Sequence, residues 1–276
     1  MSIEIALMIE GQDGTNWPRF QKIARVAEDA GYIGLYRSDH FTNPSGSYKD
    51  SLECWISLAW LATNTSRIVF GPLVSPVSFR HPSMLVRMAA EVSDLSGGRL
   101  QFGVGAGWQE REHTNYGYHL GAVPERMARF RESMQIMSHL LRSEEPLTFE
   151  GRHYQLREAV LLPRPSHHVP IVIGGSGKNV TLPMAARYAD DWNTGEKPAE
   201  QYKELNAHLD SLLDKAQRPR SEVRRSMMIF LRDDTPGQVK DRVQAVEAMG
   251  VQRVMLNWSR FDDMAGIANT AKALGL

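Results

Sequence analysis

Residues 67–104 read RIVFGPLVSPVSFRHPSMLVRMAAEVSDLSGGRLQFGV, and this stretch decides the fold of the chain. Its first part, 67–74, is short, apolar and rich in β-branched residues, which is typical of a buried strand. Residues 82–95 have apolar side chains at helical spacing, and Pro82 stands at the helix start, where a missing N–H costs nothing. Two glycines at 97–98 end this helix, and 100–104 is again short and apolar. The order strand, helix, strand favours a parallel sheet.

The same alternation continues in both directions along the chain. The other strands are predicted at residues 3–9, 33–36, 170–173, 189–192, 223–231 and 251–256. The other helices are predicted at residues 17–30, 52–62, 124–141, 180–188, 236–249 and 264–274, and one more follows residue 192 and runs to about 216. Residues 146–168 interrupt the rhythm with a hairpin and a Pro-rich loop between strands four and five.

Eight strand–helix units without a linker predict one α/β domain over residues 1–276, a (β/α)8 TIM barrel with that hairpin excursion. A doubly wound open sheet is the alternative architecture. It is disfavoured because no G-x-G-x-x-G motif follows the first strand.

Charge and cysteine content exclude several classes of partner. Lys+Arg and Asp+Glu both total 32, so no net charge draws the chain to nucleic acid or to a membrane surface. No apolar run approaches the ~18 residues of a membrane span, and the N-terminus lacks the pattern of a signal peptide. Cys54 is the single cysteine, so an internal disulfide is excluded. We therefore expect a cytoplasmic protein.

Ionisable residues gather where the second strand ends, and in such a barrel the active site lies at the carboxyl ends of the strands. Asp39 and His40 occur there in the sequence RSDHF. An imidazole at this place could act as a general acid or base, because its ordinary pKa is about 6.5. The alternative is structural: Asp39 caps a turn, and His40 packs with a satisfied hydrogen bond.

Strands three and four also end in residues suited to a ligand. At residues 73–75 backbone groups could approach a flat ring, and the glycines of the GAG sequence at 105–107 allow a close approach. Trp108 could form an aromatic wall. Glu110 and His113 follow, and whether either reaches the site stays open. For Glu112 we predict a solvated position on a helix.

After strand five, residues 173–179 read IGGSGKN and directly precede a helix. Backbone N–H groups at such a helix start can hold a phosphate, and Lys178 adds a positive charge. The alternative is a plain tight turn from strand to helix. The sequence has no H-E-x-x-H motif, cysteine-rich pattern, G-x-S-x-G elbow or P-loop, so we expect no metal site.

These features together resemble the luciferase-like monooxygenase superfamily over nearly the whole chain. The resemblance rests on AEDAGYIGLYRSDHF at 27–41, on residues 71–117, and on PIVIGGSGKNVTLPMAARYADDWN at 170–193. The forms GAGWQEREH and IGGSGKNVTL are most similar to the branch that uses the deazaflavin coenzyme F420. Relatives that use FMN share the same scaffold.

The resemblance implies the positions of the cofactor and of the catalytic groups. It places the cofactor ring at the mouth of the barrel, its phosphate near strand five, and a non-prolyl cis peptide at Leu73–Val74. Asp39 and His40 match the catalytic positions. The residues that match cofactor-binding positions are Leu73, Val74, Ser75, Gly105, Ala106, Gly107, Trp108, Gly174, Gly175, Ser176, Gly177 and Lys178. Trp108 departs from the pattern, because sugar-phosphate dehydrogenases of this family carry a catalytic glutamate there.

The function implied is hydride transfer between F420 and a small organic substrate, whose identity stays open. One alternative is an FMN-dependent two-component monooxygenase that uses reduced flavin and O2, and another is a non-catalytic flavin- or deazaflavin-binding protein. The resemblance also implies a flavin or F420 reductase as the supplier of reduced cofactor. A homodimer is common in this family, and the apolar helix at 52–61 could contribute to its interface.

Overall fold

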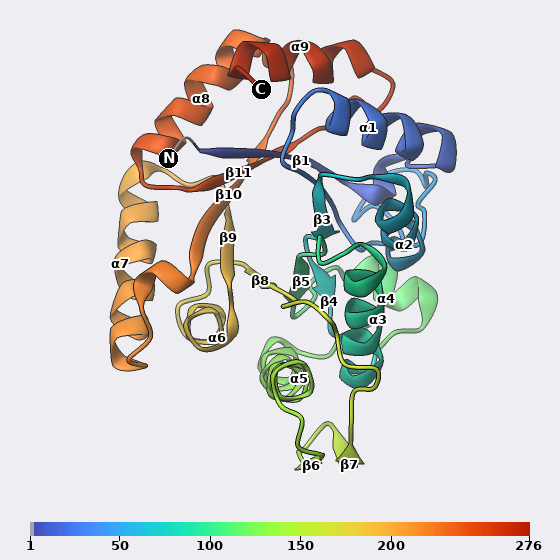
Figure 1. The fold of residues 1–276 in the computed structure, drawn as a ribbon, viewed down its shortest axis with the longest axis vertical. Helices are drawn as coiled ribbons and strands as arrows, with labels where there is room; N and C mark the ends of the chain where they lie inside the picture. Colours follow the sequence, from blue (N-terminus) through green and yellow to red (C-terminus); the bar gives the residue numbers. More distant parts are fainter. Residues whose placement is uncertain (1–2) are drawn as a thin grey trace.

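A computed structural model describes residues 3–276; residues 1 and 2 of the predicted domain lie outside the described residues. Within this range, nine parallel strands form one sheet that curls into a nearly closed barrel (Figure 1), in the order β3-β2-β1-β11-β10-β9-β8-β5-β4. The strands are β1 (Glu4–Ile9), β2 (Gly34–Arg37), β3 (Val69–Pro72), β4 (Ser75–Pro76), β5 (Phe102–Gly105), β8 (Ile171–Gly174), β9 (Asp191–Gly195), β10 (Arg224–Phe230) and β11 (Arg253–Asn257).

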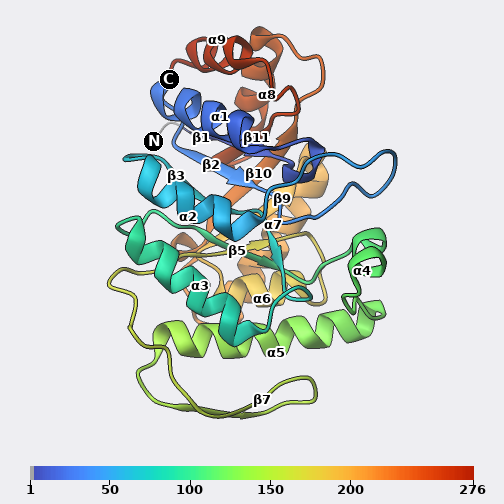
Figure 2. The ribbon, with the colours of Figure 1, turned by 90° about the vertical axis from the view of Figure 1, so that its right-hand side faces the viewer.

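Helices surround this barrel on the outside (Figure 2), and the predicted (β/α)8 architecture is confirmed. They are α1 (Trp17–Asp29), α2 (Cys54–Asn64), α3 (Pro82–Leu95), α4 (Glu110–Tyr116), α5 (Val123–Arg142), α6 (Thr181–Tyr188), α7 (Ala199–Lys215), α8 (Pro236–Ala248) and α9 (Met264–Leu274). α3 and α9 begin and end at the predicted residues, because Pro82 opens the first and Gly275 closes the second in a left-handed conformation.

The core has two layers because successive side chains of a strand point to opposite faces. On β1, Ile5, Leu7 and Ile9 pack outward in the large cluster between the strands and the helices. Ala6 and Met8 point inward and belong to the small cluster that fills the barrel.

The third predicted strand, 67–74, is shorter in the structure: β3 covers Val69–Pro72, and a second short strand, β4, follows the predicted range at Ser75–Pro76. Leu73 and Val74 separate them and are joined by a cis peptide bond, as the resemblance implied. β3 meets the fourth strand through a bridge between Phe70 and Leu100, and β4 pairs with β5. The barrel therefore closes between its third and fourth strand positions.

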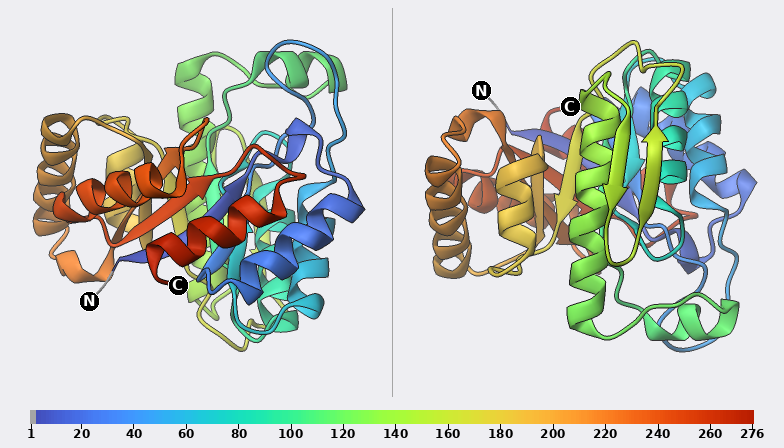
Figure 3. Two further views of the ribbon diagram at one scale, coloured as in Figure 1. Left: turned by 90° about the horizontal axis from the view of Figure 1, so that it is seen from above. Right: turned by 90° about the horizontal axis from the view of Figure 1, so that it is seen from below.

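The predicted excursion is an antiparallel hairpin of β6 (Leu147–Glu150) and β7 (Gln155–Ala159). It lies between β5 and β8 in the sequence and outside the barrel, beside α5 (Figure 3). The carboxylate of Glu132 on α5 accepts hydrogen bonds from three backbone N–H groups of the hairpin turn, residues 152–154. This contact fixes the hairpin on the helix.

Candidate functional site

A cavity of about 530 Å³ opens at the carboxyl ends of the strands. This volume lies within the roughly 300–1,000 Å³ typical of small-molecule sites. Much of its wall is apolar. The apolar side chains that line it include Leu73, Val74, Pro76, Trp108, Phe130, Met228 and Phe230. The polar side chains come from the segments after β1 and β2 and from α4 and α6. The cavity lies where a TIM barrel places its active site.

His40 lines this cavity, and its imidazole is held from behind by Glu112. The distance from His40 Nδ1 to Glu112 Oε1 is 2.7 Å, and the backbone N–H of Phe41 donates to Glu112 Oε2 at 2.9 Å. Because a carboxylate can only accept, Nδ1 carries the proton in this pair. Nε2 has no hydrogen-bond partner within residues 3–276. The nitrogen that can exchange a proton with a ligand is therefore Nε2.

The prediction that Glu112 is solvated was wrong, because Glu112 is fully buried. α4 was expected to present this face to water, but the helix packs against the segment that follows β2. The resulting pair determines the charge of the histidine. Burial lowers the pKa of His40, but the hydrogen bond and the charge of Glu112 outweigh this, so the pKa lies above its ordinary value.

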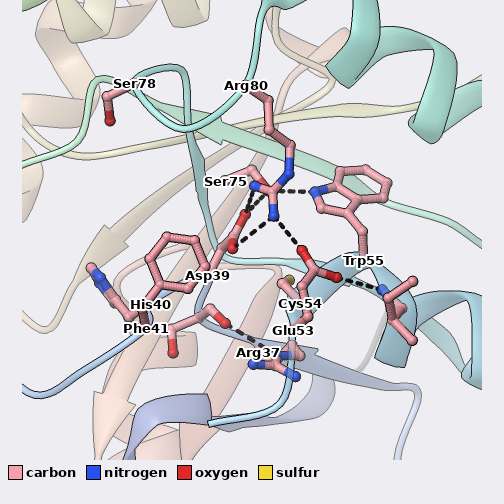
Figure 4. Close-up of polar contacts among 12 residues, drawn as sticks. Arg37, Asp39, His40, Phe41, Glu53, Cys54, Trp55, Ser75, Ser78 and Arg80 are labelled. Atoms are coloured by element: carbon pink, nitrogen blue, oxygen red, sulfur yellow. Dashed lines mark hydrogen bonds and ion pairs between the residues drawn. The ribbon is translucent and has the colours of Figure 1, made fainter. Parts of the chain in front are cut away.

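Asp39, the other residue predicted to be catalytic, does not line the cavity. Its carboxylate is buried and accepts hydrogen bonds from Ser75 Oγ and Arg80 Nη1, both at 2.6 Å. Trp55 Nε1 in turn donates to Ser75 Oγ at 3.0 Å, and Arg80 also pairs with Glu53 (Figure 4). Asp39 and His40 are adjacent in sequence, but their side chains point to different sides of the chain (Figure 4).

Of the residues predicted at the ends of strands three and four, most line the cavity. Leu73, Val74 and the segment 105–108 do, whereas Ser75 is fully buried behind it. The packing of Val74 explains why residue 105 is a glycine. A Cβ there would lie 2.6 Å from Val74 Cγ2, so the missing side chain of Gly105 makes room for Val74.

The glycine-rich loop at 174–178 contributes only Gly174 to the cavity. The N–H of Gly175 is used within the fold, since it donates to Asn193 O at 2.8 Å. Within the described chain, the backbone N–H groups of residues 176–178 have no protein acceptor. The side chain of Lys178 is half exposed and pairs with Glu204 on α7. The loop therefore retains donors for an anion.

Glu110 and His113, for which the sequence did not decide whether they reach the site, both lie outside the cavity. Glu110 is exposed on the first turn of α4. His113 is buried: its Nδ1 lies 2.6 Å from the carbonyl oxygen of Gln109, and its Nε2 lies 2.7 Å from Ser78 Oγ. Since a carbonyl only accepts, Nδ1 carries the proton and Nε2 accepts from the serine. Burial lowers the pKa of His113, which favours this neutral form.

The sequence interpretation missed Glu10 and Gln12, which line the cavity directly after β1. Asn257 Nδ2 donates to Glu10 Oε1 at 2.9 Å, and Gln12 Nε2 donates to Glu10 Oε2 at 3.0 Å. Their place after the first strand was the available signal, because every strand end of a barrel faces the same mouth.

A wider hollow of about 880 Å³ lies beside the cavity, between the loops that follow β9 and β10. Phe230 lines both spaces, so they adjoin. Lys197, Arg232 and Arg242 face three carboxylates there, and Arg242 is already paired with Glu196 and Asp234. The hollow therefore has a balanced charge.

Comparison with known proteins places this barrel in a family. A sequence model described as luciferase-like monooxygenase matches residues 1–265. The chain belongs to this family. The matched range includes the residues that line the cavity of this luciferase-like chain, from Glu10 to Phe230. None of the helices in residues 3–276 is long and apolar enough to cross a membrane.

Curated relatives of this luciferase-like chain include enzymes named for F420. An F420-dependent glucose-6-phosphate dehydrogenase of Microbacterium testaceum is 32% identical over 203 residues, which cover 72% of this chain and 59% of that protein. An F420-dependent hydroxymycolic acid dehydrogenase of Mycobacterium tuberculosis is 30% identical over 170 residues, 61% of this chain and 46% of the relative. The chain thus spans less than two thirds of the length of these relatives.

Solved structures share the fold at low sequence identity. An F420-dependent secondary alcohol dehydrogenase in complex with an F420–acetone adduct superposes with a TM-score of 0.86 at 17% identity, over 99% of both chains. The F420-dependent tetrahydromethanopterin reductase of Methanopyrus kandleri gives 0.81 at 16% identity, again over 99% of both chains. These two comparisons show that the chain has the luciferase-like barrel.

Proposed function

We propose that this protein is an oxidoreductase that transfers a hydride between the deazaflavin coenzyme F420 and a small organic substrate. The observation that carries the proposal is the cavity at the barrel mouth, where His40 presents an unpartnered Nε2 beside an apolar wall. The names of the curated relatives support F420 over FMN. The same cavity could accept the ring of FMN, so the two-component monooxygenase is the second candidate.

The residues present fit a flat, largely apolar ring. Leu73 and Val74 form one wall of the cavity, and Trp108 stands at its rim with 59% of its surface exposed. Indole and aliphatic surfaces of this kind suit the faces of a planar cofactor. When bound, F420 would supply a two-electron carrier that gives or takes a hydride.

The protein's own part in the reaction is to bind, orient and move a proton. His40 Nε2 would hold or release the proton that accompanies the hydride, because Glu112 fixes the proton on Nδ1. Asp39 would act as a positioning residue, since it contacts Ser75 and Arg80 rather than the cavity. The apolar wall would exclude water from the reacting atoms.

The glycine-rich loop would hold the cofactor phosphate through residues 174–178. Its N–H groups at 176–178 lack protein acceptors, and α6 begins shortly after it, at Thr181. The ion pair between Lys178 and Glu204 is exposed on both sides. Such an exposed surface pair is weak, so Lys178 can turn to a phosphate. We also propose that the protein is cytoplasmic, that it forms a homodimer, and that a partner reductase supplies its reduced cofactor.

The first experiment is an equilibrium titration of the purified protein with F420 and with FMN, followed by quenching of tryptophan fluorescence. We expect F420 to bind at least tenfold more tightly than FMN. A preference for FMN would support the two-component monooxygenase instead. Binding of neither would contradict the cofactor proposal. Binding of F420 without any turnover over a broad substrate panel would favour the non-catalytic binding protein.

The phosphate loop can be tested in the same titration with the phosphate-free deazaflavin ribitol as a second ligand. Lys178→Ala should weaken F420 about tenfold and leave the phosphate-free ligand unchanged. Lys272→Ala, an exposed lysine on α9, is the matched control. Equal affinity of wild type and Lys178→Ala for F420 would remove Lys178 from the site.

A further inference from the structure

The charged groups that line the cavity are unusual for a site that would bind a phosphorylated sugar. Its ionisable side chains are Glu10, His40 and Glu112, and the lining residues within 3–276 include neither lysine nor arginine. When His40 is protonated, its charge is balanced by Glu112, 2.7 Å away. Among the residues that line the cavity, the carboxylate of Glu10 then has no cationic side chain opposite it.

Glu10 is fixed in this position rather than free to turn away. Each of its oxygens accepts a hydrogen bond from a side-chain amide, one from Gln12 and one from Asn257. Neutral amides orient the carboxylate without cancelling its charge. Glu10 also contributes to raising the pKa of His40, so its field reaches across the cavity.

Aromatic side chains at the rim add to this preference. Trp108 and Phe230 line the cavity and are 59% and 47% exposed. The rings of Trp108 and His40 are nearly perpendicular, with centroids 5.6 Å apart, so the imidazole does not stack on the indole. The face of an aromatic ring attracts a cation and does not attract an anion.

From the carboxylates, the missing cationic side chains and the exposed aromatic rim, we infer that the cavity selects a substrate with a cationic reacting group, namely an iminium ion. This inference rests on the proposed function and narrows its substrate class. A cationic substrate would distinguish this protein from relatives named for a phosphorylated sugar. Such a sugar is negatively charged, and the carboxylates of the cavity would repel it.

Reduction of an iminium ion by a hydride consumes no proton, so it needs no added acid. A hydride from the reduced deazaflavin bonds to the iminium carbon, and the C=N π pair moves to the nitrogen. The nitrogen thereby loses its positive charge and becomes a neutral tertiary amine. The proton that the oxidised cofactor releases goes to His40 Nε2 and from there to water. Two electrons leave the cofactor, and two arrive on the substrate.

The test uses three bicyclic probes of similar size: the cation N-methyl-3,4-dihydroisoquinolinium, the neutral ketone 1-tetralone, and the anion of a tetralin carboxylic acid. Their dissociation constants are measured by calorimetry on the protein loaded with oxidised F420, which prevents turnover. The cation should bind about tenfold more tightly than the ketone, and the carboxylate at least tenfold more weakly. With reduced F420, the cation should also be converted to its tetrahydro amine.

Two variants assign the preference to named residues. Glu10→Gln keeps the shape of the side chain and should reduce the advantage of the cation over the ketone to about threefold or less. Phe230→Leu should reduce it by a similar factor. Glu110→Gln removes an exposed carboxylate of α4 that does not line the cavity, and it should change nothing.

The outcomes separate this inference from the proposed function. Equal or tighter binding of the ketone or the carboxylate, with F420 bound normally, would overturn the cationic substrate class and leave the oxidoreductase standing. An unchanged preference in Glu10→Gln and Phe230→Leu would also overturn it. If F420 itself does not bind, the proposed function fails, and calorimetry on the cofactor-free protein still decides the charge preference.

Discussion

His40 and Glu112 show how a single contact fixes both the tautomer and the charge of a residue. The histidine is largely buried, which by itself disfavours the protonated form. The carboxylate of Glu112 has its two oxygens occupied by His40 Nδ1 and by the N–H of Phe41, so it stays in place. We regard Glu112 as a positioning residue, because it acts on the ligand through the imidazole.

Glu112→Gln should therefore change the pH dependence more than the fold. The variant keeps the size of the side chain but removes the charge, so burial dominates and the pKa of His40 falls. In the wild type, the raised pKa of His40 contributes stability below about pH 6.5, and this contribution is lost as the pH rises through the folded-state pKa. The variant should lack it.

The measurement is an NMR titration of the His40 Cε1–H signal, assigned by its absence in His40→Ala, together with pH–rate profiles. The signal and the corresponding limb of the rate profile should both move to lower pH in Glu112→Gln. An unchanged midpoint would remove Glu112 from this role. Glu112→Asp should restore part of the shift, since it keeps the charge.

At the scale of elements, Arg80 ties the loop after β4 to β2 and α2. It precedes α3 and reaches the carboxylates of Asp39, directly after β2, and Glu53, at the start of α2 (Figure 4). Burial by itself would lower the pKa of Arg80. The charge and the hydrogen bond of Asp39 outweigh burial and raise the pKa above its ordinary value, so the guanidinium stays charged. The same carboxylate also holds Ser75 at the start of β4. These contacts support the cavity wall from behind.

Arg80→Met should destabilise the protein strongly. It leaves the Asp39 carboxylate, whose side chain is 1% exposed, without its cationic partner. Breaking a buried pair from one side costs about 3–5 kcal/mol. The double variant Asp39→Asn/Arg80→Met should lose clearly less than the sum of the two single variants. Urea unfolding of all four proteins measures this coupling, and additive losses would contradict it.

At the scale of the whole molecule, closure of the barrel depends on backbone contact between strands three and four. A Cβ at Gly103 would lie 1.9 Å from the carbonyl oxygen of Pro72, and one at Gly71 would lie 1.9 Å from the carbonyl oxygen of Gln101. No rotamer can relieve a clash that involves backbone on both sides. Glycine at these positions lets β3 and β5 approach.

Gly103→Ala should consequently force the two strands apart. Overpacking of this kind costs about 3 kcal/mol, which corresponds to a decrease in Tm on the order of 10 °C. Gly237→Ala is the matched control: it lies in α8, nothing surrounds the added methyl group, and a gain of about 0.4–1 kcal/mol is expected. Differential scanning calorimetry compares the two. An unaltered Tm for Gly103→Ala would contradict the closure argument.

The sequence by itself determined the order of the elements, because hydrophobic periodicity and helix-ending residues are local properties. α3 and α9 were predicted to the residue for this reason, and the hairpin at 146–168 was recognised by its break in the rhythm. It also placed His40, Leu73, Val74 and the segment 105–108 at strand ends, where they line the cavity.

Only the tertiary structure decided which of these side chains share an environment. Glu112 lies 72 residues from His40 in the sequence, and no local pattern distinguishes a carboxylate that faces water from one that faces an imidazole on another element. The same holds for Asp39, which turns away from its neighbour toward Arg80, and for Gly105, whose missing side chain accommodates Val74. Burial and pairing depend on segments that the fold brings together, so they become visible only when the barrel is closed.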